Sequence, residues 1–394
     1  MPGSVIVAGA RTPIGKMQGA FATLAATELG GHAITAALAR AGVAPEEVDL
    51  VIMGQVLLAG AGQMTARQAA VNAGIPMSVP ATVVNKVCLS GINAIIQADQ
   101  MIAAGDAEIV VAGGMESMTN APYLLPQARA GYRLGDGQLI DSMMYDGLTC
   151  AFDRTSMGLA TDRYTTTAGL SRAAQDEFSA MSHERAAAAI KEGRMADEIV
   201  AVSVAQRRGD PLLVDTDEGV RPGTTAESLA SMRPAFDKNG TITAGSSSQI
   251  SDGGSAVVVM SRAAAERRGV TPLGEVVSYG MVAGPDTSLL HQPSNAIRKA
   301  LGRAGLAVSA VDLFEMNEAF AAVALASMAD LGVADDVVNV NGGAIALGHP
   351  IGASGNRIVL TLLHELRRRG GGLGAAALCG GGGQGDALVV RSPA

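Results

Sequence analysis

The stretch ITAALARAGVAPEEVDL at residues 34–50 returns as IRKALGRAGLAVSAVDL at residues 297–313, and this repeat decides the fold. Ten of the seventeen aligned residues are identical, and the alignment has no gap. Each copy has the pattern of an amphipathic helix that ends at a glycine and leads into a buried strand. Chance similarity between alanine-rich helices does not explain so many identities in register. The chain therefore contains one structural unit twice.

The two units alternate strands with helices, and later motifs follow in the same order in both. The helix opening SGIN at residues 90–93 corresponds to SGNR at residues 354–357. In the first half we expect strands at 4–8, 50–53, 81–85 and 108–112, and helices at 27–41, 64–73 and 89–104. In the second half we expect strands at 274–282, 311–316, 336–340, 374–379 and 386–391, and helices at 294–304, 319–331 and 354–369. Short Val- and Ile-rich strands between helices predict an α/β fold whose sheets are covered on both faces.

Residues from about 120 to 250 have no counterpart in the other half. They are rich in charged residues and contain a long alanine-rich helical pattern near 172–192. We expect this segment to be an insertion folded over the first half. The run SAVVVM at residues 255–260 then returns to the first sheet as another strand.

Composition limits the classes of function. Hydrophobic residues make up 48% of the chain and charged residues 17%, so a large core is expected and disorder is not. The net charge is −8 without a run of like charges, which argues against nucleic acid or an anionic membrane as the main partner. An anionic small ligand stays possible, because a few arginines can bind phosphate on an acidic protein.

The cysteine count and the apolar runs predict a cytoplasmic protein. Three cysteines are an odd number in a long chain, which favours free thiols in a reducing compartment. The first residues lack the basic region of a signal peptide and read as a strand. No uncharged apolar run reaches the length needed to span a membrane.

Cys88 is the first candidate catalytic residue. It lies in NKVCLSG at residues 85–91, between a predicted strand and a predicted helix. A helix N-terminus favours the thiolate form of a cysteine. Most free cysteines are simply small buried hydrophobes, and we interpret Cys150 in this way. The position of Cys88 favours a nucleophile instead.

His349 and Cys379 lie in glycine-rich stretches of the second half. His349 opens HPIGASG at residues 349–355, in the loop of the repeat that corresponds to the Cys88 loop. Cys379 precedes four glycines, which free backbone N–H groups to bind an oxyanion. Each stretch could be only a turn, but two thiols and an imidazole in such settings indicate acyl-transfer chemistry.

Other site classes fit poorly. Gly380, Gly382 and Gly385 satisfy the spacing of a dinucleotide-binding loop, but a strand follows them where that motif requires a helix. His183 and His364 are each followed by glutamate without the second histidine of a zinc motif, so no metal site is expected. No serine lies in a nucleophile elbow.

Four ordered motifs together resemble the thiolase family, particularly its acetyl-CoA acetyltransferases. They are NKVCLSG (85–91), NEAF (317–320), GHPIGASG (348–355) and CGGGGQG (379–385), and the resemblance covers essentially the whole chain. It implies duplicated βαβαβαββ domains that form a five-layer αβαβα sandwich with an inserted loop domain. The implied bounds are 1–119 with 251–270 for the N-terminal domain, 120–250 for the CoA-binding loop domain and 271–394 for the C-terminal domain.

The resemblance also implies the roles of the site residues. Cys88 would accept the acyl group, His349 its proton, and Cys379 would deprotonate a second acetyl-CoA. Asn317 would hold a water at the enolate, and the N–H groups of Cys88 and Gly381 would hold the thioester oxyanion. The positions implied along CoA are Arg221, Ser228, Ala244 and Ser248. Acetyl-CoA, CoA and acetoacetyl-CoA are then substrates and products in lipid metabolism, no cofactor is tightly bound, and the implied assembly is a homotetramer.

Two departures from the acetyl-specific pattern leave acyl length open. Ser156 stands where those enzymes have histidine, and Gln249 follows the pantetheine serine where they tend to have glycine. A 3-ketoacyl-CoA thiolase of broader chain length, acting in β-oxidation, is therefore the alternative. A ketoacyl synthase lacks the Cys379 turn. A silent acyl-CoA- or lipid-binding relative would have lost Cys88 or His349.

Overall fold

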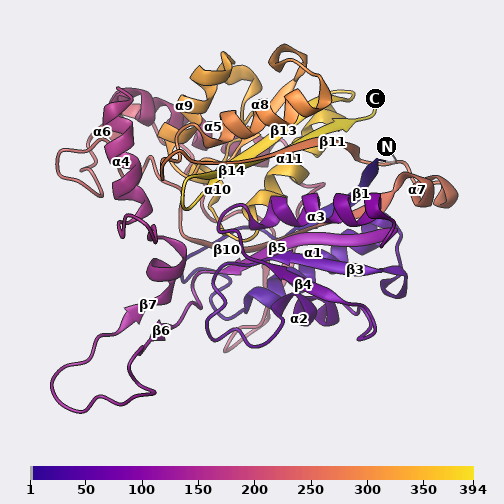
Figure 1. Cartoon of the computed structure of the whole chain (residues 1–394), viewed down its shortest axis with the longest axis horizontal. Helices are drawn as coiled ribbons and strands as arrows, with labels where there is room; N and C mark the ends of the chain where they lie inside the picture. The colour runs from indigo at the N-terminus through magenta and orange to yellow at the C-terminus, as the bar shows by residue number, and fades with distance from the viewer. Residues whose placement is uncertain (1–2) are drawn as a thin grey trace.

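In the computed structural model, which describes residues 3–394, ten strands form one mixed sheet flanked by helices (Figure 1). The first half supplies β1 (Ser4–Arg11), β2 (Gly15–Lys16), β3 (Leu50–Gly54), β4 (Ala81–Val84), β5 (Ile109–Ser117) and β10 (Ser251–Ser261). The second half supplies β11 (Gly274–Ala283), β12 (Leu313–Met316), β13 (Gly372–Gly380) and β14 (Gln384–Ser392). The strand order is β12-β13-β14-β11-β1-β10-β5-β3-β4, with β2 beside β10. Within the sheet, the two halves meet where Val5 and Ile6 of β1 pair with Glu275 and Gly274 of β11.

The helices complete five layers. They are α1 (Ala26–Ala41), α2 (Thr65–Asn72), α3 (Ser90–Ala104), α7 (Arg262–Arg268), α8 (Gln292–Ala304), α9 (Ala321–Leu331), α10 (Ala344–Leu347) and α11 (Ser354–Arg368). One core cluster packs α1 and α2 on the first half-sheet, and another packs α8 on the second. Between the half-sheets lies a third cluster, in which Ile95 of α3 and Leu363 of α11 are fully buried. The expected αβαβα sandwich is therefore confirmed.

One expected strand, at residues 336–340, is wrong. The segment forms a short 3₁₀ turn at Asp335–Val337, and Val338 makes a single bridge to Phe314. The side chain of Asn339 replaces the backbone hydrogen bonds that a neighbouring strand would make. Its amide oxygen accepts from Met316 N at 2.8 Å, and its amide nitrogen donates to Met316 O at 2.8 Å. A buried side-chain amide thus satisfies the backbone groups that a strand would have paired.

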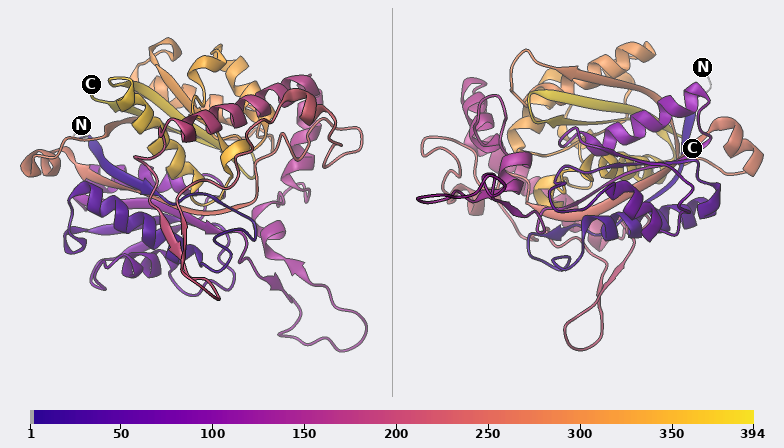
Figure 2. Two further views of the ribbon diagram at one scale, coloured as in Figure 1. Left: turned by 180° about the vertical axis from the view of Figure 1, so that it is seen from behind. Right: turned by 60° about the horizontal axis from the view of Figure 1, so that its bottom comes forward.

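The insertion contacts both halves, not only the first as expected. Its elements are β6 (Tyr123–Leu124), β7 (Ile140–Asp141), α4 (Met157–Thr167), α5 (Arg172–Lys191), β8 (Val202–Val204), β9 (Leu212–Val214) and α6 (Ala226–Ala230). On α5, Phe178 packs with Ala321, Ala324 and Ile345 of the second half. The β8–β9 hairpin packs on Phe21 and Leu29 of the first half. The segment between β6 and β7 extends from the body as a long arm (Figure 2).

Among the residues that the structure describes, one helical segment, residues 87–104, is long and apolar enough to cross a membrane. This segment contains α3, and 56% of it is buried inside the protein. Its apolar side chains fill the middle layer of the sandwich, as expected for a core helix.

Candidate active site

Cys88 lies in a tight turn between β4 and α3. The side chain is half-buried, two residues before the first helical residue, Ser90. The helix N-terminus led us to expect a favoured thiolate, but burial outweighs this effect and raises the pKa of Cys88 to about 12. The carboxylate of Glu116 acts in the same direction. The resting nucleophile is therefore a neutral thiol that needs a base.

His349 lies in the loop between α10 and α11 and is 5% exposed. Its Nδ1 is 2.6 Å from Ser354 Oγ, and Ser354 Oγ donates to Pro350 O at 3.0 Å. With the hydroxyl proton of Ser354 directed at Pro350, we assign the tautomer in which Nδ1 donates to Ser354 Oγ and Nε2 carries the lone pair, facing Asn317 Nδ2. Burial and Arg357 lower the pKa of His349 to about 3, so the imidazole is neutral. It can accept a proton at Nε2.

Glu116 and Gly114 hold the His349 loop against the first half. A Cβ on Gly114 would lie 2.0 Å from the Gly352 carbonyl oxygen, so only glycine admits the loop this closely. The buried carboxylate of Glu116 accepts from Gly352 N at 3.0 Å and from Val56 N at 2.9 Å. Burial raises the pKa of Glu116 to about 7, although these N–H donors oppose the rise.

Asn317, directly after β12, faces the imidazole. Its Nδ2 lies 3.4 Å from His349 Nε2, and the residue is fully buried. Among the described residues, Asn317 Oδ1 has no hydrogen-bond partner. A buried amide oxygen without a partner is a suitable anchor for a water molecule.

Cys379 lies near the end of β13 and is 1% exposed. Burial first, and then the neighbouring Cys88, raise its pKa far above that of a free thiol. The turn after it also reaches the Cys88 loop, since a Cβ on Gly381 would lie 3.5 Å from Val87. The structure therefore brings Cys88, Cys379 and Gly381 together from different halves of the chain.

A cavity of about 560 Å³ opens beside these groups and lies largely between the insertion and the two halves. Its lining includes His349 together with Arg221, Ala244 and Ser248, three of the four positions predicted along CoA. The apolar lining is Met17, Met118, Met144, Leu148, Met157, Ala235, Phe236, Ile250, Phe320 and Ile351. Neither thiol is part of the lining. Cys88 packs against the apolar cluster that contains the lining residue Ile351, and Cys379 belongs to the cluster that contains the lining residue Phe320.

Ser228 does not line this cavity. It is an exposed residue in the first turn of α6, where Ser228 Oγ donates to Thr225 O at 2.8 Å and Ser228 N donates to Thr225 Oγ1. These are the bonds of a helix cap. Its role at CoA stays a prediction.

The two residues that depart from the acetyl-specific pattern both line the cavity. Ser156 caps α4, because its Oγ accepts from Leu159 N at 3.3 Å. Gln249 directs its amide at backbone carbonyls, donating to Ile345 O at 2.9 Å and Gly219 O at 3.0 Å. It thereby ties the insertion to α10, and its amide nitrogen is already satisfied by protein.

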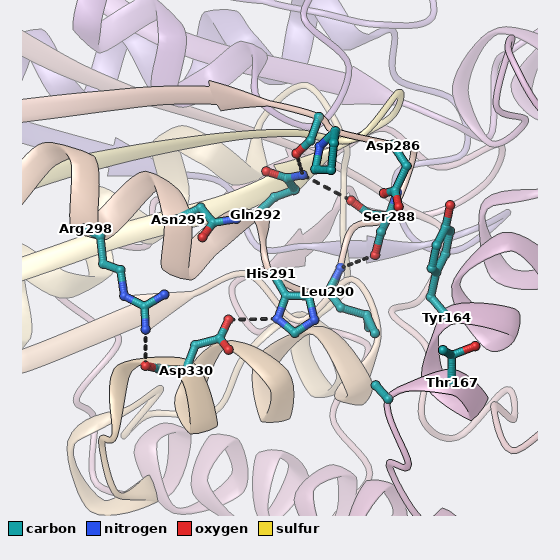
Figure 3. A pocket seen from close by; sticks show the side chains of 13 residues that line it. Tyr164, Thr167, Asp286, Ser288, Leu290, His291, Gln292, Asn295, Arg298 and Asp330 are labelled. Carbon is teal, nitrogen blue, oxygen red and sulfur yellow. Dashed lines mark hydrogen bonds and ion pairs between the residues drawn. The ribbon is translucent and has the colours of Figure 1, made fainter.

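A second hollow, of about 580 Å³, lies between α4 and the N-terminus of α8 (Figure 3). In it, His291 Nδ1 is 2.8 Å from Asp330 Oδ2, and both side chains are partly exposed. This hollow is lined by residues outside the predicted site. Within residues 3–394 no group of three or more His, Cys, Asp or Glu side chains has the arrangement of a metal site.

Sequence patterns missed the residues that support the site. Ser354 lies in the motif GHPIGASG and Glu116 shortly after an expected strand, yet no spacing rule assigns either of them a partner. The contacts that give them a role, His349 to Ser354 and Gly352 to Glu116, exist only in the folded chain. A nucleophile, a neutral base, a second thiol and glycine-turn N–H groups beside a mainly apolar cavity suit acyl transfer through a thioester.

Comparison with known proteins agrees with this chemistry. A family model described as "Thiolase, N-terminal domain" matches residues 4–263, and "Thiolase, C-terminal domain" matches residues 270–392. A probable acetyl-CoA acetyltransferase of Mycolicibacterium smegmatis is 58% identical over 387 residues, which cover 98% of this chain and 100% of that protein. One from Mycobacterium tuberculosis is 56% identical over 100% of both chains. An acetyl-CoA acetyltransferase of Cupriavidus necator is 52% identical over 98% of both.

Proposed function

This chain belongs to the thiolase family, and we propose that it is an acetyl-CoA C-acetyltransferase. It would condense two acetyl-CoA molecules to acetoacetyl-CoA and CoA, and catalyse the reverse thiolysis. The observation that carries the proposal is a pair of neighbouring thiols, Cys88 and Cys379, packed against the apolar clusters of a cavity whose wall holds the neutral imidazole of His349. The names of full-length relatives supply the acetyl group and the CoA carrier.

In the first half-reaction, His349 Nε2 takes the proton of Cys88 as the sulfur attacks the acetyl-CoA carbonyl. The thiol and the imidazole are both neutral at rest, so charge develops only during the reaction. The N–H groups of Cys88 and Gly381 stabilise the oxyanion. CoA leaves with the proton from His349, and the acetyl group remains on Cys88 as a thioester.

In the second half-reaction, Cys379 as a thiolate removes a proton from the methyl group of another acetyl-CoA. Burial is the main cause of the raised pKa of Cys379, so the thiolate that acts as the base is the minor form of this residue at rest. His349 and a water on Asn317 Oδ1 stabilise the enolate oxygen, and the enolate carbon attacks the Cys88 thioester. Cys88 leaves as a thiolate and regains its proton from Cys379.

The cavity suits the pantetheine arm of CoA. Its wall is mainly apolar, with Ser248 able to bond an amide of pantetheine and Arg221 able to meet a phosphate. We assign Ser228 to the nucleotide end on family resemblance alone. The reaction needs no tightly bound cofactor.

We further propose that the protein is a cytoplasmic homotetramer that acts in lipid metabolism. The arm formed by β6, β7 and the segment between them supports the assembly, because it presents Tyr123, Leu125, Leu134 and Leu139 to solvent, with Leu134 fully exposed. Apolar side chains gathered on an extended arm favour contact with another subunit. Three free cysteines favour a reducing compartment.

The decisive experiment is mass spectrometry of the intact protein after brief exposure to acetyl-CoA. We expect one acetyl adduct, and peptide mapping should place it on Cys88. Cys88→Ser should fold, bind CoA and lose nearly all turnover. An adduct on Cys379 or Cys150 would reverse the assignment, and no adduct at all would refute the proposed function.

A further inference from the structure

The turn that carries Cys88 has a strained backbone. Val87 adopts a left-handed conformation with φ +51°, which a β-branched residue rarely does. Local bonds hold it, since Asn85 Oδ1 accepts from Val87 N at 3.1 Å and Ser90 Oγ donates to Val87 O at 2.6 Å. Such strain persists only where the surrounding structure requires it, and it concentrates at functional sites.

Lys86, the residue before Val87, forms an ion pair with the opposite half of the chain. Its Nζ lies 2.7 Å and 2.9 Å from the two carboxylate oxygens of Asp386 on β14. Asp386 is fully buried, and Asn93 of α3 donates to its Oδ2 at 3.2 Å. A single carboxylate therefore binds both the turn before Cys88 and the helix after it.

Asp386 belongs to the hairpin that carries Cys379. It pairs across β13 and β14 with Leu378, and Gly385 pairs with Cys379. The hairpin packs tightly on the Cys88 loop, because a Cβ on Gly380 would lie 2.6 Å from Leu89 Cγ. The ion pair thus lies at the junction of the two loops that supply the oxyanion donors, Cys88 N–H and Gly381 N–H.

We propose that Lys86 and Asp386 are positioning residues for acyl transfer: their ion pair holds the strained Cys88 turn against the Gly381 turn and so sets the spacing of the two oxyanion donors. This inference rests on the proposed function and adds to it two residues that position the oxyanion donors. Neither residue touches the substrate in this scheme. Their effect passes through the backbone of two loops, which otherwise belong to separate halves of the duplicated fold.

The test compares two reactions of the same thiol. Acetylation of Cys88 by acetyl-CoA needs the oxyanion donors, whereas alkylation of Cys88 by iodoacetamide does not. Lys86→Met should slow acetylation by about 100-fold, the loss expected when a catalytic donor is displaced. Alkylation at Cys88, followed by peptide mapping, should proceed at the wild-type rate. Lys86→Arg should restore most of the acetylation rate.

Asp386→Asn should reproduce Lys86→Met, and the double variant should be no slower than either single variant, because the two residues act as one unit. Arg268→Met is the matched control, because it also removes the cation of an ion pair, here with Glu47. Arg268 is 25% exposed and Lys86 23%, and Arg268 lies away from the site. Thermal unfolding checks whether each variant is folded. If a variant of the ion pair is not folded, Lys86→Gln is used in its place.

Equal loss of acetylation and alkylation would mean general damage to the site and would overturn the positioning role. Acetylation of Lys86→Met at the wild-type rate would overturn it as well. Acetylation of the wild-type protein distinguishes a failure of this proposal from a failure of the proposed function. Absence of an acetyl adduct on wild-type Cys88 refutes the function, whereas labelling of wild type and variant at equal rates refutes only the role of the ion pair.

Discussion

In the proposed mechanism His349 serves both half-reactions, whereas Cys379 serves only the second. His349 would act through Nε2 in both, and this nitrogen lies 3.4 Å from Asn317 Nδ2. Cys379 is 1% exposed near the end of β13 and would act only on the second acetyl-CoA. The two residues should therefore be separable by experiment.

Cys379→Ala should still acquire an acetyl group on Cys88 but fail at condensation and at thiolysis. His349→Ala should slow both halves, each by about 100-fold or more, because a general base contributes factors of this size. Quenched-flow labelling with acetyl-CoA, followed by a condensation assay, measures the two steps apart. Equal loss of labelling in both variants would show that the roles are not divided in this way.

The pH dependence of Cys88 reactivity follows from its raised pKa. With a pKa of about 12, the thiolate fraction rises about tenfold per pH unit throughout the neutral range, without the plateau of a free thiol near 8.5. The pKa of His349, lowered to about 3, adds no protonation step between pH 5 and 8. Alkylation of Cys88 by iodoacetamide should therefore climb steadily with pH. A plateau above pH 7 with a fall near pH 6 would indicate a thiolate–imidazolium pair instead.

At the scale of elements, the start of α4 shapes the cavity. Ser156 is both the N-cap of this helix and part of the cavity wall, next to Met157. The flexible side chain of Met157 can repack around a longer acyl chain. A histidine at position 156 would fill space and remove the cap.

Wild-type enzyme should accept acetoacetyl-CoA and tolerate somewhat longer or branched 3-ketoacyl-CoAs. In Ser156→His, the relative kcat/KM for C6 and C8 chains should fall by about fourfold per buried methylene, since each is worth about 0.8 kcal/mol. Loss of the cap should also lower stability by about 1 kcal/mol. The control is Ser156→Ala, which loses the cap without filling the cavity. Strict C4 selectivity in all three proteins would mean that Ser156 does not shape the acyl pocket.

At the scale of the whole molecule, a buried cluster joins the insertion to the first half. Arg11, 1% exposed on β1, lies 2.7 Å from Glu198 and 2.7 Å from Asp217. Its backbone also pairs with the insertion, since Val200 N donates to Arg11 O at 2.8 Å. The insertion forms part of the cavity wall, so this junction holds the proposed CoA-binding surface in place.

Arg11→Met should lower the free energy of unfolding by about 3–5 kcal/mol, because it leaves two buried carboxylates without their cation. Urea unfolding measures the change, and limited proteolysis should cut the insertion first. The comparison is Arg267→Met, whose exposed pair with Glu108 should contribute at most about 1 kcal/mol. Equal stability of the two variants would mean that the Arg11 cluster does not hold the insertion.

The sequence alone determined the duplication, the α/β class and most elements, and it singled out three candidate reactive residues. These follow from local signals: the repeat at 34–50 and 297–313, the period of the apolar residues, and glycine-rich motifs around Cys88, His349 and Cys379. The bounds of α1 and α3, for example, lie within one residue of those expected. Family resemblance then supplied roles that no spacing rule gives.

Only the tertiary structure decided which groups meet and in what charge state. Asn339 replaced the expected strand at 336–340 because its amide satisfies Met316, a contact that no local pattern encodes. Burial reversed the expected pKa shift of Cys88, because desolvation depends on what the whole chain packs around a thiol. The ion pair of Lys86 with Asp386 joins residues 300 positions apart. Long-range packing sets such contacts, so a local sequence reading cannot contain them.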